Sequence, residues 1–210
     1  MNLANYLTFI RIFISPVFMF LYIEHELLGI SMTLLPYLLL FLFGVSELSD
    51  AFDGYVARRY DQVTDLGKIL DPMADSIYRI SVFLTFTRPP VEVPLLLVFV
   101  FLYRDSVIST LRTICALRGF ALAARSSGKI KAVIQAGSAF IILLLLIPYS
   151  LGLITQDSLH YTAIIVVAIS AIYALYSGVE YVYSNREYVL KLLTSDKVKI
   201  NEPVPLNRKK

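Results

Sequence analysis

Six long apolar stretches make up most of this chain and restrict what it can fold into. They lie at residues 7–23, 32–45 with a helical continuation to 58, 73–87, 93–115, 133–153 and 161–183. A helix needs roughly 20 mostly apolar residues to cross a bilayer, so a chain of 210 residues has little length for anything else. The hydrophobic share of 57% and the mean hydropathy of +0.69 exceed those of a soluble domain. The sequence predicts an all-α integral membrane protein with six transmembrane helices.

Basic residues alternate between the segments that connect these stretches. Residues 24–31 and 148–160 contain no Lys or Arg, whereas 58–68 contain three, 112–131 five and 186–210 seven. Because cytoplasmic loops carry the excess of Lys and Arg, we expect both termini and the two basic loops on the cytoplasmic side. The polar start predicts a short N-terminal interfacial helix at residues 2–8 and no cleavable signal peptide. Residues 1–190 would form one membrane domain, and 191–210 a polar basic cytoplasmic tail.

The remaining composition excludes some kinds of site and partner. The single cysteine, Cys115, excludes an internal disulfide and does not fit a cysteine-ligated metal centre. The net charge of +3 is too small to indicate nucleic-acid binding. No nucleic-acid partner is therefore expected.

Four aspartates interrupt the second and third stretches at helical spacing. Asp50 and Asp53 are three residues apart, and Asp71 and Asp75 are four apart, so each pair shares a helix face. Four carboxylates near hydrocarbon would repel one another unless cations neutralise them. Oxygen ligands without His or Cys suit Mg²⁺ or Mn²⁺, ions that phosphate-bearing substrates commonly share. We interpret the group as a site for divalent metal and a pyrophosphate-containing substrate.

For any single aspartate, an ordinary ion pair with a nearby basic residue is an equally good interpretation. The candidates for such pairs are Arg58, Arg59, Lys68 and Arg79. Ionisable residues inside membrane segments usually mark function, so the joint pattern favours a site. Gly54 and Ala57 share the face of the aspartates and would let a flat group approach the backbone closely.

The pattern D-x2-D-G-x2-A-R-x8-G-x3-D-x3-D is complete in this chain and resembles the signature of the CDP-alcohol phosphotransferase family. Its eight positions are Asp50, Asp53, Gly54, Ala57, Arg58, Gly67, Asp71 and Asp75. The resemblance implies six membrane helices and a site that faces the cytoplasm. It also implies transfer of a substituted phosphoryl group from a CDP-linked donor to an alcohol, with release of CMP.

The same resemblance implies roles for individual residues. The metal ligands, for two Mg²⁺ or Mn²⁺ ions, would be Asp50, Asp53, Asp71 and Asp75, and Asp75 would also be the catalytic base. The nucleotide would bind around Asn5, Thr8, Asp53, Gly54, Ala57, Arg58 and Gly67. A carboxylate base is chemically reasonable because an alcohol is a poor nucleophile at neutral pH.

Two further stretches resemble bacterial phosphatidylglycerophosphate synthases, a branch of that family. The N-terminal pattern N-x-P-N-x-L-T-x-x-R is matched by Asn2, Asn5, Leu7, Thr8 and Arg11, with Ala4 in place of proline. Residues 104–135 resemble the R-E and A-A-x-x-x-G-K-x-K-T-x-x-Q segments, with Asp105 for glutamate, Arg125 for a small polar residue and Ala132 for threonine. This resemblance implies CDP-diacylglycerol as donor, glycerol 3-phosphate as acceptor, a bacterial inner membrane location and a homodimer among membrane lipids.

A basic cluster in residues 104–131 suits the phosphate group of an acceptor. Its candidate phosphate-binding residues are Arg104, Arg112, Arg118, Lys129 and Lys131. Orientation in the membrane and contact with anionic lipid headgroups explain part of such a cluster. Inositol phosphate, inositol or serine stay open as acceptors. A metal or anion transporter is the alternative from another class, although the aspartate motif occurs once and transporters often have repeated halves.

Overall fold

Six α-helices are the regular elements of the part of the chain that the structure, a computed structural model, describes: residues 3–59, 65–117, 126–186 and 189–190. In chain order the helices are α1 (Leu3–Ile23), α2 (Leu35–Arg59), α3 (Asp65–Thr85), α4 (Leu95–Leu117), α5 (Ser126–Ser150) and α6 (Gln156–Ser184). The predicted all-α architecture and the number of helices are confirmed for these residues.

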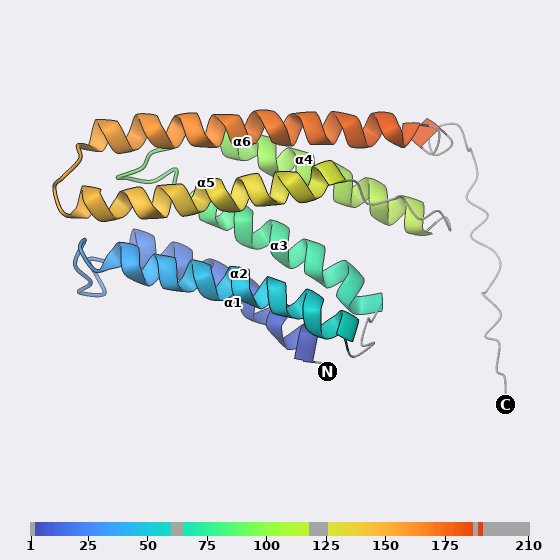
Figure 1. The fold of residues 1–210 in the computed structure, drawn as a ribbon, viewed down its shortest axis with the longest axis horizontal. Helices are drawn as coiled ribbons and strands as arrows, with labels where there is room; N and C mark the ends of the chain where they lie inside the picture. The colour runs from blue at the N-terminus through green and yellow to red at the C-terminus, as the bar shows by residue number, and fades with distance from the viewer. Residues whose placement is uncertain (1–2, 60–64, 118–125, 187–188, 191–210) are drawn as a thin grey trace.

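The helices form two groups that lie side by side. α1 packs against α2 and α3, while α6 packs against α4 and α5; contacts of α2 with α5 and of α3 with α4 and α5 join the groups. The C-terminal ends of α2, α4 and α6 and the N-terminal ends of α1, α3 and α5 lie at one end of the bundle (Figure 1). Every basic segment of the sequence is attached to this end, because each one follows an even-numbered helix.

Aromatic side chains fill the core between α1, α3 and α4. Phe83 and Phe101 have ring centroids 4.8 Å apart, and Phe86 makes edge contacts with Phe18, Tyr22 and Phe83. These rings are almost completely buried. Because aromatic pairs bury large areas and stack in preferred geometries, they fix how the two groups of helices meet.

Large apolar side chains also cover the outside of the bundle. Phe13, Leu96, Val133 and Leu153 are each at least 70% exposed, and an extended apolar surface of this kind indicates contact with lipid. Within the described residues, α5 and α6 are long and apolar enough to cross a membrane, and residues 8–23 form a shorter apolar stretch. Charged side chains interrupt α2, α3 and α4, so composition alone does not qualify them as spans.

The structure adds two details to the sequence prediction. α1 runs without a break from Leu3 to Ile23, so over residues 3–8 the predicted short N-terminal helix is the first part of α1. α3 begins at Asp65 and α5 at Ser126, both earlier than the apolar stretches predict. Apolar stretches mark only the lipid-facing length of a helix, and helical hydrogen bonding continues through polar residues at its end.

Candidate active site

One buried guanidinium group joins the two described aspartates of the signature. Arg11 of α1, which is 2% exposed, donates through Nη1 to Oδ1 of Asp50 at 2.7 Å and also to Oδ1 of Asp75. Asp50 belongs to α2 and Asp75 to α3, and α1 packs against both helices. The predicted convergence of the two aspartate-bearing helices is therefore present at these two residues.

The other predicted ligands share these helices, but the structure does not describe their side chains. Asp53 lies in α2 and Asp71 in α3. The predicted nucleotide residues Asn5, Gly54, Ala57, Arg58 and Gly67 likewise have side chains outside the described part. Thr8 is described and completely buried, and it lies three residues before Arg11 on the same face of α1. Of the predicted nucleotide residues, Thr8 thus lies on the face of α1 that carries Arg11.

The arrangement fits a divalent cation. Carboxylate oxygens of Asp50 and Asp75 both accept from Nη1 of Arg11, so two negatively charged groups from different helices meet at one point. Carboxylate oxygens are also the ligands that Mg²⁺ and Mn²⁺ prefer. The described side chains include no group of three or more His, Cys, Asp or Glu able to hold a metal. A complete ligand set would therefore need Asp53 and Asp71 as well.

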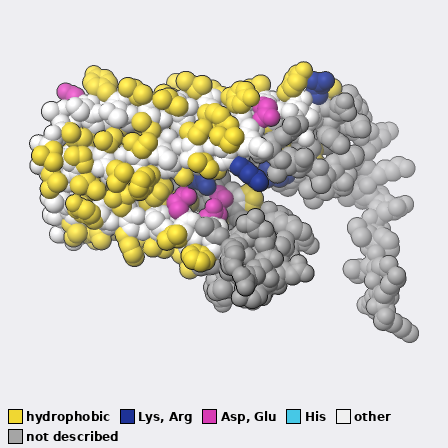
Figure 2. All heavy atoms as spheres, viewed as in Figure 1, with side chains coloured by type: hydrophobic (Ala, Val, Ile, Leu, Met, Phe, Trp, Pro, Cys, Tyr) yellow, Lys and Arg dark blue, Asp and Glu magenta, His cyan; other side chains and the backbone are white. Residues whose placement is uncertain are grey.

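A cleft of about 520 Å³ opens beside Asp50, between α2, α3 and α5. Its charged lining consists of Glu47, Asp50 and Arg79. The rest of its lining is apolar or small: Phe43, Ala132, Val133, Ala136, Gly137 and Phe140. Figure 2 shows acidic and basic side chains together near the middle of the face, with apolar side chains around much of them. A cleft that is charged in one part and apolar in the rest suits an amphipathic molecule.

Two of the predicted phosphate-binding residues share one carboxylate, that of Asp105. Nη1 of Arg104 donates to Oδ1 of Asp105 at 2.9 Å, and Nζ of Lys131 donates to both carboxylate oxygens at 2.7 and 2.9 Å. The three side chains are 11%, 7% and 11% exposed for Arg104, Lys131 and Asp105. Ser76, which directly follows Asp75, donates its hydroxyl to Oδ2 of Asp105 at 3.3 Å. The basic cluster therefore adjoins the aspartate site.

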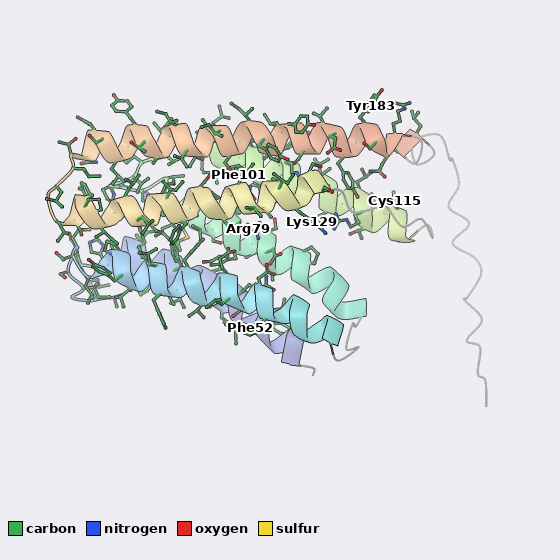
Figure 3. All side chains as sticks on the ribbon, viewed as in Figure 1. Phe52, Arg79, Phe101, Cys115, Lys129 and Tyr183 are labelled. Carbon is green, nitrogen blue, oxygen red and sulfur yellow. The ribbon has the colours of Figure 1, made fainter. Side chains whose placement is uncertain are left out.

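The other predicted phosphate-binding residues do not join this pair. The guanidinium carbon of Arg112 lies 5.9 Å from the ring centroid of Tyr181 in α6, and the arginine is exposed. Lys129 is exposed in the first turns of α5; it is labelled with Arg79 in Figure 3. Arg118 lies outside the described residues. Arg104 and Lys131 thus form the basic part of the site that the structure supports.

Sequence reasoning missed Arg11 and Asp105 as members of the site. Arg11 stood in the N-terminal pattern, and its spacing from Thr8 was the available signal, since both lie on one helix face. Asp105 was noticed only as a replacement for glutamate. An acidic residue inside a basic, buried segment is itself a signal, because burying several like charges requires a counter-ion.

Comparisons with known proteins agree with these features. A family model described as CDP-alcohol phosphatidyltransferase matches residues 1–175. A CDP-diacylglycerol–glycerol-3-phosphate 3-phosphatidyltransferase of Rickettsia typhi is 33% identical over 145 residues, which cover 68% of this chain and 76% of the relative. The Bacillus subtilis protein of that name is 31% identical over 156 residues, covering 71% and 80%. A probable phosphatidylglycerophosphate synthase of Mycobacterium tuberculosis is 29% identical over 181 residues, covering 86% and 80%.

The family match covers most of the chain and includes both the aspartate pair and the cluster around Asp105. The matched residues contain the eight-residue signature, helices α1 to α5 and most of α6. The chain therefore belongs to the CDP-alcohol phosphatidyltransferase family.

Proposed function

We propose that this protein transfers the phosphatidyl group of CDP-diacylglycerol to glycerol 3-phosphate, giving phosphatidylglycerophosphate and CMP in phospholipid biosynthesis. The printed names of its relatives support this reaction. One structural observation carries it. The carboxylates of Asp50 and Asp75 meet at Arg11 beside a largely apolar cleft, and next to them Arg104 and Lys131 are buried around the carboxylate of Asp105. The first part suits a lipid pyrophosphate, and the second suits the phosphate of the acceptor.

The donor would bind along the cleft between α2, α3 and α5. Its diphosphate would lie beside Asp50, and an acyl chain would follow the apolar wall formed by Phe43, Val133 and Phe140 toward the bilayer. Two Mg²⁺ or Mn²⁺ ions, held by Asp50, Asp53, Asp71 and Asp75, would neutralise the diphosphate and stabilise the departing CMP. The cytidine would bind near Thr8 and the glycine-containing segments of α2 and α3.

The catalytic base in this proposal is Asp75. The acceptor's hydroxyl oxygen forms a bond to the phosphorus of the phosphatidyl group, and the bond from that phosphorus to the oxygen of CMP breaks. The hydroxyl proton passes to the carboxylate of Asp75 as the new bond forms. Asp75 is half-buried in the middle of α3 and is paired with Arg11, so its carboxylate already faces α1 and the junction of α1, α2 and α3.

The acceptor's phosphate would bind to Arg104 and Lys131. Both cations are buried beside Asp105, where a charge-assisted hydrogen bond is stronger than at an exposed surface. Ser76, the residue after the base, donates to Asp105 of this cluster. This contact supports a proposal in which the acceptor's phosphate and its reacting hydroxyl bind near neighbouring turns of α3 and α4. Inositol phosphate would offer the same charged group, whereas serine and inositol would not.

The arrangement of the helices supports a topology in which all six cross the cytoplasmic membrane. All helix ends that adjoin the basic segments lie at one end of the bundle, which would face the cytoplasm together with the active site and both termini (Figure 1). Residues 1–190 would then form one membrane domain, with a cytoplasmic tail at 191–210 and a homodimer as the assembly.

Purified protein given CDP-diacylglycerol and a panel of labelled acceptors tests the reaction. We expect release of CMP and formation of a phosphorylated lipid with glycerol 3-phosphate, and little with glycerol. Use of inositol phosphate in place of glycerol 3-phosphate would leave the phosphate pocket intact and make the acceptor assignment wrong. Equal use of glycerol and glycerol 3-phosphate would contradict the pocket itself.

A further inference from the structure

Arg104 reaches its position through space that a glycine of α6 leaves open. A Cβ atom built at Gly178 would lie 3.1 Å from Cγ and 4.0 Å from Nε of Arg104. A separation of 3.1 Å is shorter than nine in ten real Cβ contacts. Any larger residue at 178 must therefore displace Arg104 or push α6 away from α4. Gly178 lies beyond residues 1–175, the part of the chain that the family match covers.

The other end of the same side chain is fixed by Asp105. The carboxylate accepts from Arg104 and, at 2.7 and 2.9 Å, from Lys131 of α5. Two cations this deeply buried repel each other strongly unless an anion lies between them. Asp105 supplies that anion from α4 itself, so both cations stay in place before any acceptor arrives.

We propose that Gly178 and Asp105 are positioning residues that set the place of Arg104, and with it the binding of the acceptor's phosphate. Asp105 holds Arg104 and Lys131 at one point, and Gly178 gives Arg104 room to extend between α5 and α6. The inference rests on the proposed function, because it assumes that these two cations meet the acceptor. It adds α6 to the acceptor site, although residue 178 belongs to no motif found in the sequence.

A series of glycine substitutions separates positioning from general packing. A Cβ at Gly178 meets Arg104 at 3.1 Å, one at Gly128 meets Nη2 of Arg104 at 3.9 Å, and one at Gly44 of α2 meets nothing within 4 Å. Gly178→Ala should raise the KM for glycerol 3-phosphate by roughly threefold to tenfold, since small displacements of binding groups have large effects. Gly128→Ala should change that KM by less than about twofold, because 3.9 Å is ordinary contact. Gly44→Ala is the control and should change nothing.

The three variants are compared in the full-length protein in lipid nanodiscs, with kcat, both KM values and thermal stability measured for each. The proposal requires Gly178→Ala to affect the acceptor's KM while donor KM and melting temperature stay near wild type. An unchanged acceptor KM would overturn it. Equal loss of donor and acceptor affinity with a lowered melting temperature would also overturn it, because that result indicates helix packing alone.

Substitutions of Asp105 test the second half of the proposal and do not depend on a glycine variant that folds. Asp105→Asn should raise the acceptor's KM about tenfold or more, since the amide cannot balance two cations. Asp105→Glu should recover most of the affinity, because it keeps the negative charge on a side chain one methylene longer. A lower KM in Asp105→Asn would show that the carboxylate competes with the phosphate, which contradicts a positioning role.

Direct binding distinguishes this inference from the proposed function. Inorganic phosphate and glycerol 3-phosphate are titrated into the purified wild type and Gly178→Ala by calorimetry, without donor. If the wild type binds both anions but forms no lipid product, the proposed reaction is wrong, and a loss of phosphate affinity in Gly178→Ala still supports positioning. If Gly178→Ala binds phosphate as tightly as the wild type, the positioning role is wrong whatever the reaction.

Discussion

The two groups of helices solve the same electrostatic problem with opposite charges. In α1–α3, carboxylates from two helices gather around the buried guanidinium of Arg11. In α4–α6, two buried cations gather around the carboxylate of Asp105. Burying like charges costs several kcal/mol per ion unless a counter-ion lies among them. Each group therefore carries its own counter-ion, and a ligand of matching charge would enter an arrangement that is already built.

The two counter-ions, Arg11 and Asp105, have different roles. Arg11 lies where a divalent cation would bind, so the cation and the guanidinium would share the same carboxylates. Asp105 accepts hydrogen bonds from Arg104, from Lys131 and from Ser76, so an incoming phosphate would join it as a second anion beside the same two cations. We therefore expect the carboxylate group to depend completely on an added ion, and the basic group to bind its ligand without one.

The largest expected effect is on metal. Activity should be lost in excess chelator and return with Mg²⁺ or Mn²⁺, because the carboxylates need an added cation to hold the diphosphate. Asp50→Ala should raise the metal concentration needed for half-maximal activity steeply or abolish activity. CMP release at graded metal concentrations measures both. Full activity in chelator would mean that Arg11 alone provides the positive charge, and the two groups would then be alike.

The next largest effect concerns the proposed base. Asp75→Asn should lower kcat by about 10²- to 10⁴-fold, because the amide keeps the size of the side chain and cannot accept a proton. Donor binding should remain close to wild type, as measured by titration of CDP-diacylglycerol in nanodiscs. Loss of donor binding instead would assign Asp75 to metal binding alone. Near-normal turnover would contradict its role as the base.

A smaller effect is expected in the basic group, where the structure ranks two predicted residues. Lys131→Ala should raise the acceptor's KM roughly tenfold or more, since one charge-assisted hydrogen bond contributes about 1.5 to 3 kcal/mol. Arg112→Ala should raise it less, because Arg112 is exposed and lies over the ring of Tyr181. Donor KM is the internal control for both variants. The reverse order would show that the phosphate binds toward α6 and away from Asp105.

The sequence predicted more of the site in α1–α3 than of the site in α4–α6. Asp50 and Asp75 could be predicted because each has a second aspartate three or four residues away, a spacing that puts the pair on one helix face wherever that helix packs. The six helices could be predicted because apolar stretches of membrane length leave few alternatives. The contact of Arg104 with Gly178 could not be predicted, since it depends on how closely α4 and α6 approach each other. The early starts of α3 at Asp65 and α5 at Ser126 were not predicted, because apolar stretches do not mark where helical hydrogen bonding begins.

The smallest expected effect concerns the contact that links the two groups. Ser76 follows the proposed base and donates to Oδ2 of Asp105 at 3.3 Å, a length that indicates a weak hydrogen bond. Ser76→Ala should therefore raise the acceptor's KM by only about twofold to threefold, with kcat almost unchanged. Combining it with Asp105→Asn should add nothing further, because the hydroxyl acts through that carboxylate. If Ser76→Ala lowers kcat and leaves the acceptor's KM unchanged, the hydroxyl serves the base, and the aspartate site extends further into α3 than Asp75.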